Sequence, residues 1–502
     1  MSENGETEIE LTSILAEESS ICIGTMLNDD QCYQAILSRD RRFDGVFFVG
    51  VSSTGIYCRT ICTVKTPRRE NCTFYSSAAA AEQAGYRPCL RCRPELAPGQ
   101  AKIDAVGRLA AAAASRIEDG ALTEQSVSEL AHSLGVSDRH LRRVLQQEFG
   151  VSPIQLAQTQ RLLLAKRLLT DSHLSIAEIA FASGFSSVRR LNALFQKRYR
   201  LNPFSIRKVT NVPQDVLRCE LAYRPPLDWQ GLLRFLQARM IQGVEHIKDH
   251  CYLRTVRIGE YQGWVRVSLI PKQDKLQVEL SASLIAAILP VLTRVKALFD
   301  LAADPVAIAN HLQSFCSPGL RVPGAFDRFE VTLRTILGQQ VSVKSATTLM
   351  KRVVQTFGTP IETPIAELTY LSPTPAQIAD LSPQALTQLG ILSSRATSII
   401  TIAQAITAGT LQLEHCADVE STIAQLKTLP GIGEWTAQYL SMRVFAYPDA
   451  FPHSDLGLRR ALRLEKPAQV LQLAEAWRPW RAYAAMSLWK SLEQSELCTT
   501  SG

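Results

Sequence analysis

The spacing of hydrophobic residues changes along the chain and predicts different folds in different segments. Residues 103–208 carry apolar positions at helical spacing throughout, with no strand-like run. Residues 218–280 instead alternate helical stretches with β-rich runs such as 252–258 and 264–270, which is typical of a mixed α+β domain. From about residue 284 the apolar spacing is helical to the end of the chain.

The first hundred residues follow neither pattern. Residues 1–25 are acidic and polar without a sustained period, and we expect a flexible tail there. Residues 26–97 combine a strand-like run at 45–51 with a Ser-Ser-Thr-Gly turn and two close pairs of cysteines. Two proline-containing stretches, ELAPGQ at 95–100 and TNVPQ at 210–214, are predicted to be domain boundaries.

A chain of 502 residues is too long for one compact domain, and its charge is unevenly distributed. The net charge is only +7, but residues 1–57 hold 3 bases against 10 acids. Residues 58–100 hold 7 bases against 3 acids, and residues 101–210 hold 16 against 9. The basic excess, which a nucleic-acid partner would explain, therefore peaks in the first half after an acidic start.

Hydropathy and the N-terminal residues bear on the compartment. No run of 18 or more apolar residues occurs, which excludes a membrane-spanning helix. The first residues carry acids where a secretory signal needs bases, so we expect the chain to stay in a reducing compartment. Its 12 cysteines are then expected to be thiols or metal ligands and not disulfides.

Four of the cysteines have the spacing of a zinc site. Cys58 and Cys62 form one close pair and Cys89 and Cys92 another, with 26 residues between the pairs. Four thiolates in two such pairs enclose a tetrahedral Zn²⁺, which stabilises a segment too short for a large core. A zinc deaminase shares the Pro-Cys-x-x-Cys half of this pattern but also needs His-x-Glu, and the first histidine is His132. A zinc that only stabilises the fold remains the alternative to a reactive one.

Basic residues and short motifs surround these cysteines. Seven basic side chains form a surface suited to phosphate. They are Arg59, Lys65, Arg68, Arg69, Arg87, Arg91 and Arg93. The motifs TGIYCRTIC, RREN and GYRPCLRCRPE resemble the N-terminal domain of the Ada regulators of the adaptive response to alkylation.

This resemblance implies a reactive zinc site. In that family one zinc thiolate takes a methyl group irreversibly from a methyl phosphotriester in DNA, and the matching residue is Cys58. The remaining zinc ligands are then Cys62, Cys89 and Cys92. Cys72 belongs to neither pair and is expected to be a bystander.

The same chemistry provides a switch. Zinc keeps sulfur deprotonated at neutral pH, and the thiolate is the form that displaces at carbon. Zn²⁺ with four thiolates has a formal charge of −2, which becomes −1 when one sulfur is methylated, so repulsion from phosphate falls and DNA affinity is expected to rise. If the domain has decayed to a structural zinc module, Cys58 will carry no methyl group.

The helical segment contains an internal repeat. Ala131 and Gly135 recur as Ala180 and Gly184, 49 residues later in each case. A small Ala four residues before a turn Gly, followed by Ser and another helix, is what a helix-turn-helix requires. An ordinary helical bundle with solvated arginines is the alternative for one copy alone, and the repetition disfavours it. Basic residues follow each Gly: Arg139, His140, Arg142 and Arg143, then Arg189, Arg190, Lys197 and Arg198.

Two such motifs joined by a long helix, at about 154–169, resemble the AraC-type DNA-binding domain over residues 103–208. The resemblance implies two recognition helices that read successive major-groove segments of promoter DNA, with RNA polymerase as a further partner. The residues expected to contact DNA are Arg139, Arg142, Arg143, Arg189 and Arg190.

The segment LPGIGEWTA at 429–437 has the form of a helix-hairpin-helix. Gly431 and Gly433 allow a sharp turn that exposes amides beside a helix N-terminus, where a DNA phosphate can bind. Asp455 follows Gly433 by 22 residues. This layout resembles the helix-hairpin-helix DNA glycosylases, which have a Gly/Pro-rich loop and a catalytic Asp. A passive DNA-binding module, or an Asp that only caps a helix, remains the alternative.

The broadest match is to the alkylpurine branch, the AlkA-like 3-methyladenine DNA glycosylase II family of the HhH-GPD superfamily. The resemblance runs from about residue 223 to 489 and includes the motifs RPPLDW, ILGQQVSV and WRPWR. It implies that Asp455 is the catalytic carboxylate and that Gln340 is the wedge that fills the vacated stack, a position where the best-known relative has Leu. It also implies a base pocket lined by Phe235, Trp435, Tyr439 and Trp489.

An aromatic pocket suits an alkylated purine because alkylation at a ring nitrogen makes the base cationic. Such a base leaves readily, so a carboxylate that stabilises the developing sugar cation or orients water is sufficient, once the nucleotide has flipped out. Bifunctional relatives place a Lys where this chain has Trp435, and some carry a four-cysteine iron–sulfur loop. We therefore expect a monofunctional enzyme without a cluster. The Pro-Cys-His-Arg site of O6-methylguanine methyltransferases is missing, so that repair activity is expected to be absent.

The predicted protein is multidomain and mainly α with α+β parts. It would sense methyl phosphotriesters, activate transcription and excise alkylated bases from double-stranded DNA, in the bacterial cytoplasm and associated with the nucleoid. The alternative is a transcription factor whose C-terminal half binds DNA without catalysis. The predicted domains are a flexible tail (1–25), a zinc methyl-acceptor domain (26–97), an all-α double helix-turn-helix domain (101–210), a mixed α+β domain (218–300) and an all-α glycosylase domain (301–492).

Overall fold

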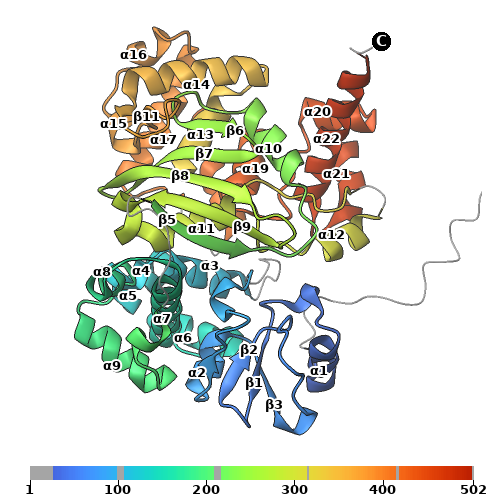
Figure 1. Ribbon diagram of the computed structural model, residues 1–502. Coiled ribbons are helices and arrows are strands. Elements are labelled where there is room, and N and C mark those ends of the chain that lie inside the picture. Colours follow the sequence, from blue (N-terminus) through green and yellow to red (C-terminus); the bar gives the residue numbers. More distant parts are fainter. Residues whose placement is uncertain (1–26, 99–106, 208–215, 314–315, 414–417, 500–502) are drawn as a thin grey trace, which may run out of the picture.

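The chain folds into three parts that contact one another (Figure 1). The cysteine domain and the double helix-turn-helix domain lie side by side, and the C-terminal unit covers both of them. No helix among the residues described below is long and apolar enough to cross a membrane. The predicted tail and the predicted boundary at 210–214 lie outside those residues. The computed structural model describes the cysteine domain over 27–98, the double helix-turn-helix domain over 107–207, and the C-terminal unit over 216–313, 316–413 and 418–499.

A small four-stranded sheet forms the centre of the cysteine domain. The elements in chain order are α1 (Asp29–Leu37), η1 (Arg41–Phe43), β1 (Phe48–Val51), β2 (Ile56–Cys58), η2 (Arg69–Asn71), β3 (Cys72–Tyr75), α2 (Ala78–Gln83), β4 (Arg87–Pro88) and η3 (Pro94–Leu96). The strand order is β3-β1-β2-β4, with β1 antiparallel to β2 and β3, and β2 parallel to β4. The predicted strand at 45–51 forms β1, which is buried along its whole length.

Helices make up the described part of the double helix-turn-helix domain. They are α3 (Gly107–Glu118), α4 (Ala121–Glu124), α5 (Val127–Ser133), α6 (Asp138–Phe149), α7 (Pro153–Asp171), α8 (Ile176–Ala182), α9 (Val188–Tyr199) and η4 (Pro203–Ile206). Gly135 and Gly184, in the turns of the two motifs, adopt φ values of +71° and +76°, which L side chains rarely adopt. Ser126 and Ser175 each start the first helix of a motif in a capping box with the glutamate three residues later. The repeat in the sequence is therefore a structural repeat.

The C-terminal unit begins with a five-stranded antiparallel sheet. Its elements are β5 (Val216–Ala222), α10 (Trp229–Ala238), β6 (Glu245–Lys248), β7 (Cys251–Ile258), β8 (Tyr261–Leu269), β9 (Lys275–Ser281), η5 (Ala282–Ala287) and α11 (Ile288–Leu298). The strand order is β5-β9-β8-β7-β6. The two β-rich runs seen in the sequence pair with each other as β7 and β8. The predicted fold class, mainly α with α+β parts, is confirmed.

The rest of the C-terminal unit is mainly helical. Its helices are α12 (Pro305–Leu312), α13 (Arg328–Leu337), α14 (Val343–Phe357), α15 (Pro375–Ala379), α16 (Pro383–Thr387), α17 (Ser393–Thr407), α18 (Val419–Lys427), α19 (Glu434–Arg443), α20 (Leu456–Leu462), α21 (Pro467–Ala474), η7 (Glu475–Trp477) and α22 (Arg481–Thr499). The prediction of helix alone was wrong at two places, because β10 (Thr359–Pro360) pairs with β11 (Tyr370–Leu371). Strands of two residues are too short to show a period in the sequence.

The predicted linker at 95–100 was wrong in its first part. Glu95 accepts an ion-paired hydrogen bond of 2.6 Å from Lys166 Nζ, and each of these side chains is only 2% exposed. Leu96 is buried as well. The partner of Glu95 lies 71 residues further along the chain, so local composition could not reveal the contact.

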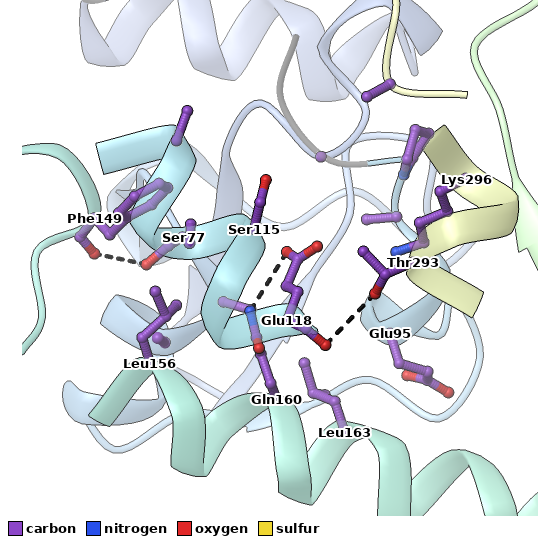
Figure 2. Close-up of a pocket in the computed structure, with 18 of the residues that line it drawn as sticks. Ser77, Glu95, Ser115, Glu118, Phe149, Leu156, Gln160, Leu163, Thr293 and Lys296 are labelled. Carbon is purple, nitrogen blue, oxygen red and sulfur yellow. Dashed lines mark hydrogen bonds between the residues drawn. The ribbon is translucent and has the colours of Figure 1, made fainter. Parts of the chain in front are cut away.

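A cavity of about 390 Å³ lies where the three parts meet (Figure 2). Its lining includes Ser77 of the cysteine domain, Glu118 of α3 and Thr293 of α11. Thr293 Oγ1 donates a hydrogen bond of 3.5 Å to the main-chain oxygen of Glu118. The three parts thus all contribute to the lining of this cavity.

Glu82, at the end of α2, joins the cysteine domain to the double helix-turn-helix domain. Its Oε1 accepts hydrogen bonds from Tyr57 Oη at 3.1 Å and Tyr199 Oη at 2.9 Å. Its Oε2 accepts one from Thr159 Oγ1 at 3.0 Å. Burial raises the pKa of the Glu82 carboxyl to about 7, although the three hydroxyl donors act in the opposite direction.

Replacing Glu82 by glutamine should change how stability depends on pH. The pKa of this carboxyl rises from 4.5 to about 7 on folding, so between these values only the folded state keeps the proton. Its contribution to stability therefore falls as the pH rises through this range. The free energy of unfolding of Glu82→Gln, relative to wild type, should increase between pH 5 and pH 8 by on the order of 3 kcal/mol.

Urea unfolding of both proteins at the two pH values measures this difference. Glu465→Gln, which changes an exposed carboxyl, serves as the control and should show no such increase. An equal difference between Glu82→Gln and wild type at both pH values would contradict the prediction.

Candidate functional site

The four predicted zinc ligands come together in the cysteine domain. The Sγ atoms of Cys58, Cys62, Cys89 and Cys92 all lie within 4.8 Å of one another. Tetrahedral Zn²⁺ with Zn–S bonds of about 2.3 Å needs sulfurs about 3.8 Å apart, so the four residues fit the ion. Cys72 is not part of this group, and its thiol donates to the main-chain oxygen of Arg68. We call the four ligands the cysteine cluster.

The thiols of the cluster perturb one another. A hydrogen bond from Cys58 lowers the pKa of Cys62 to about 7, and hydrogen bonds from the neighbouring thiols also lower that of Cys89. The same contacts raise the pKa values of Cys58 and Cys92. Two main-chain N–H groups point at sulfur: that of residue 59 lies 3.4 Å from Cys92 Sγ, and that of residue 91 lies 3.4 Å from Cys89 Sγ. Such donors stabilise thiolates.

The basic surface around the cluster is smaller than the sequence indicated. Arg59 is buried and its Nε donates to Asp44 Oδ1 at 2.7 Å. Arg69 lies close to two carboxylates of α1, and Arg93 is ion-paired with Glu95. The exposed bases near the cluster are Lys65, Arg68 and Arg91.

The predicted DNA-contacting arginines of the two recognition helices lie on the surface. Arg139, Arg142 and Arg143 are exposed on α6, and Arg189 and Arg190 are exposed on α9. Arg142 is ion-paired at 2.7 Å with an aspartate one turn earlier on the same helix. Exposed guanidinium groups on the second helix of each motif are placed where a major groove would meet them.

The predicted hairpin lies between α18 and α19. Gly431 has φ +75°, and a Cβ there would lie 2.1 Å from Ser398 Oγ, so only glycine fits. Gly433 caps α19 with an extended backbone, and both glycines are exposed. The amides at this helix start are therefore accessible to a DNA phosphate.

Gln340 lies in the turn between α13 and α14. It is exposed and has φ +53°, an uncommon conformation for a residue with a side chain. The preceding residue, Gln339, donates from Nε2 to the main-chain oxygen of Gly431 at 2.9 Å and to Thr436 Oγ1 at 3.0 Å. Gln339 thus ties the turn of Gln340 to the hairpin, a role that was not predicted from the sequence.

Asp455 is the residue on which three helices converge. It is the N-cap of α20, and its Oδ1 accepts a hydrogen bond of 3.0 Å from the main-chain N–H of Leu458. Oδ1 also accepts from Trp489 Nε1 on α22 at 3.0 Å, and Oδ2 accepts from Trp435 Nε1 on α19 at 2.8 Å. From the sequence, Asp455 could either cap a helix or lie at the aromatic site. In the structure it does both. A Cβ at Gly457 would lie 2.9 Å from Oδ1, so the glycine leaves room for the carboxylate.

Three of the four aromatic residues predicted for the pocket lie together beside this carboxylate. The rings of Trp435 and Tyr439 are stacked, with centroids 5.2 Å apart and an interplanar angle of 15°. Trp489 lies 6.1 Å from Tyr439 at 54°. The structure thus brings Trp435, Tyr439 and Trp489 together, with the two indole N–H groups turned toward Asp455.

Phe235 lies among guanidinium groups that the sequence analysis missed. The Cζ of Arg239 is 3.8 Å from the centre of the Phe235 ring and that of Arg443 is 4.9 Å away. Arg443 Nη1 also donates to Tyr439 Oη at 2.9 Å. Burial raises the pKa of Tyr439, but Arg443, Arg239 and Arg334 outweigh it, so the net pKa is lowered. Arg239 follows Phe235 by four residues and Arg443 follows Tyr439 by four, and this helical spacing is the signal that could have found them.

Family comparisons agree with this arrangement. The four matching family models are the metal binding domain of Ada (residues 31–95), a helix-turn-helix domain (130–208), the AlkA N-terminal domain (218–327) and the HhH-GPD superfamily base excision DNA repair protein (333–469). The domains and the site together define a DNA-binding regulator joined to a DNA repair protein.

Individual relatives cover the whole chain or its parts. A probable bifunctional transcriptional activator/DNA repair enzyme AlkA of Mycobacterium tuberculosis (strain CDC 1551 / Oshkosh) is 36% identical over 488 residues, 93% of this chain and 97% of that protein. The DNA-3-methyladenine glycosylase 2 of Escherichia coli (strain K12) is 38% identical over 271 residues, 54% of this chain and 95% of that protein. The Ada enzyme of the same organism, a bifunctional transcriptional activator/DNA repair enzyme, is 37% identical over 145 residues, 29% of this chain and 38% of that protein.

This chain belongs to the family of bifunctional transcriptional activator/DNA repair enzymes AlkA. The resemblance to an Ada regulator fused to a glycosylase of the HhH-GPD superfamily is confirmed. The prediction of Zn²⁺ as the cofactor is confirmed as well, by the match to the Ada metal-binding domain and by the close approach of the four sulfurs.

Metal analysis should find one zinc per chain. Cys89→Ser removes one of the four ligands and should reduce the bound zinc severalfold, because tetrahedral structural sites need all four. Cys72→Ser changes a buried thiol of the same domain outside the cluster and should keep full zinc. Equal zinc contents in the two variants would contradict the assignment.

Proposed function

We propose that the C-terminal unit excises alkylated bases of the 3-methyladenine and 7-methylguanine type from double-stranded DNA. The observation that carries the proposal is the Asp455 carboxylate, which the indole N–H groups of Trp435 and Trp489 hold beside a group of aromatic rings. The relative that covers this unit is named a DNA-3-methyladenine glycosylase, which supports the same activity. Net hydrolysis breaks the glycosidic C–N bond, the cationic base leaves as a neutral base with the electron pair, and water adds to the sugar carbon and releases a proton.

In this proposal the flipped base binds beside the aromatic rings of Trp435, Tyr439 and Trp489. An alkylated purine is cationic, and π-electron density attracts it. Because guanidinium groups lie close to the Phe235 ring, that side of the pocket contributes shape more than cation binding. Asp455 then stabilises the developing positive charge on the sugar or orients water. Bifunctional enzymes form a Schiff base through a lysine, and this chain has Trp435 at that position. The reaction therefore proceeds without a Schiff base.

The hairpin and the turn of Gln340 would hold the DNA. The exposed amides near Gly431 and Gly433 bind a backbone phosphate, and Gln340 enters the stack where the base has left. Gln339 joins the two elements, so phosphate binding and wedge insertion occur in a fixed geometry.

The cysteine domain is proposed to take a methyl group from a methyl phosphotriester. The Cys58 sulfur forms the new S–C bond while the methyl C–O bond breaks, and the phosphodiester leaves with the electron pair. Zinc, when bound, keeps the sulfur deprotonated at neutral pH. The exposed arginines of α6 and α9 then bind promoter DNA and bring the chain to RNA polymerase, in the nucleoid of a bacterial cytoplasm.

Asp455→Asn should abolish base release. Asparagine still caps α20, so the fold is kept while the negative charge is lost. We expect the rate of 3-methyladenine release from methylated duplex DNA, measured by chromatography, to fall by about 100-fold or more. The control is Glu465→Gln, which changes an exposed carboxyl group ten residues further along the chain. This variant should release base at the wild-type rate. No release by wild type would favour a DNA-binding protein without catalysis.

Trp435→Phe should slow base release while leaving an aromatic ring in place. The variant loses the N–H that donates to Asp455 Oδ2, and a hydrogen bond to a charged group contributes about 1.5–3 kcal/mol. We expect a decrease of about tenfold or more in the single-turnover rate, with little change in DNA affinity. Trp264→Phe, a tryptophan in β8, is the matched control. A wild-type rate for Trp435→Phe would show that the indole does not position the carboxylate.

Mass spectrometry tests the methyl acceptor. After incubation with duplex DNA that contains methyl phosphotriesters, one methyl group should be found on the peptide that contains Cys58, and Cys58→Ser should carry none. A methyl group on Cys92 in place of Cys58, or on neither residue, would overturn the assignment.

A further inference from the structure

The short helix α2 of the cysteine domain contacts the ends of both recognition helices. Ser77 Oγ, at its start, donates to the main-chain oxygen of Phe149 at the end of α6, at 2.7 Å. Arg198, near the end of α9, donates to the main-chain oxygen of Glu82 at 3.3 Å and to Gln83 Oε1 at 3.1 Å. One element of the cysteine domain therefore lies against both DNA-reading helices.

The side chain of Glu82 strengthens this contact from within. Its carboxyl group is buried and accepts hydroxyl hydrogen bonds from Tyr57 on β2, Thr159 on α7 and Tyr199 on α9. All four residues are buried. Burying a carboxyl group costs free energy unless its oxygens accept hydrogen bonds. Loss of any one hydroxyl donor would therefore weaken the whole network.

Tyr57 connects this network to the cysteine cluster. It directly precedes Cys58 on β2, and its main-chain oxygen accepts a hydrogen bond of 3.0 Å from the N–H of Cys89. Its side chain donates to Glu82. The main chain of one residue is thus tied to two zinc ligands, and its side chain is tied to the carboxyl group that α9 also contacts.

The cavity in Figure 2 lies next to this network. Ser77, Phe149 and Thr159 all line it. Closely packed interiors resist displacement, whereas a side that faces empty volume does not. A shift of α2 therefore meets less resistance on the side of the cavity than it would in a filled core.

We propose that Glu82 couples the cysteine cluster to the recognition helices, so that a chemical change at the cluster alters how firmly α9 is held. The route runs from Cys58 through Tyr57 and Glu82 to Tyr199. The coupling exists for any change at the cluster, and it rests on the proposed function only for the step in which methylation is that change.

Coupling between two sites is reciprocal, which provides the test. Tyr199→Phe and Thr159→Val each remove one hydroxyl on the helix-turn-helix side and leave every residue of the cysteine domain unchanged. In the full chain, each variant should raise the dissociation constant for zinc by about fivefold or more, the lower end of typical couplings. Competition with a colorimetric zinc chelator measures this constant.

Tyr86→Phe is the matched control. It removes a tyrosine hydroxyl within the cysteine domain, where Tyr86 packs against Tyr75, and should leave zinc affinity unchanged. Unchanged affinity in both Tyr199→Phe and Thr159→Val would overturn the proposal. An equal loss in Tyr86→Phe would also overturn it, because any lost hydroxyl would then have the same effect.

Hydrogen exchange gives the reverse measurement. Removal of zinc from the wild-type chain should speed amide exchange in α9, and this increase should be much smaller in Tyr199→Phe. Exchange in α9 that does not respond to zinc in the wild type would contradict the coupling. Neither measurement uses DNA or a methyl donor, so failure of the coupling and failure of methyl transfer are separate results.

Discussion

Helix α7 carries buried polar side chains that reach both of its neighbours, and the placement of the three parts depends on them. Thr159 donates to Glu82, and Lys166 is ion-paired with Glu95, both in the cysteine domain. Arg167, one residue further, donates to a main-chain oxygen of β5 in the C-terminal unit. These buried hydrogen bonds and this ion pair determine how the other two parts are oriented against α7. The three parts therefore have a defined placement relative to one another.

The same principle governs the pocket. Asp455 is held by N–H groups from α19, α20 and α22, which meet only in the folded unit. Its orientation is therefore determined by the fold, and such preorganisation would make the charged group effective in the proposed reaction. The ring of Trp435, which donates to this carboxylate, is stacked on the ring of Tyr439, and Arg443 donates to the Tyr439 hydroxyl. The fold therefore fixes the carboxylate, two aromatic rings and one guanidinium group relative to one another.

Features encoded by local spacing could be predicted from the sequence. A motif of a few residues was sufficient to predict the local geometry in three cases: the paired cysteines, the helix-turn-helix that repeats after 49 residues, and the glycine hairpin. Contacts between distant segments could not be predicted, because no period or motif marks them. Glu82 lies in a run of alanines, and Glu95 was placed in a linker. The indole donors to Asp455 were predicted as pocket walls, but their hydrogen bonds required the fold.

In the proposed function, one chain joins a methyl acceptor that acts once to a glycosylase site that acts repeatedly. Duplex DNA that carries tritiated methyl groups, incubated in large excess over the protein, tests this account most directly when label is counted both in the protein and in free bases. We predict protein-bound label that stops at one methyl group per chain, while free methylated bases continue to accumulate far beyond one per chain. Base release that also stops at one per chain, or protein without label, would contradict the account.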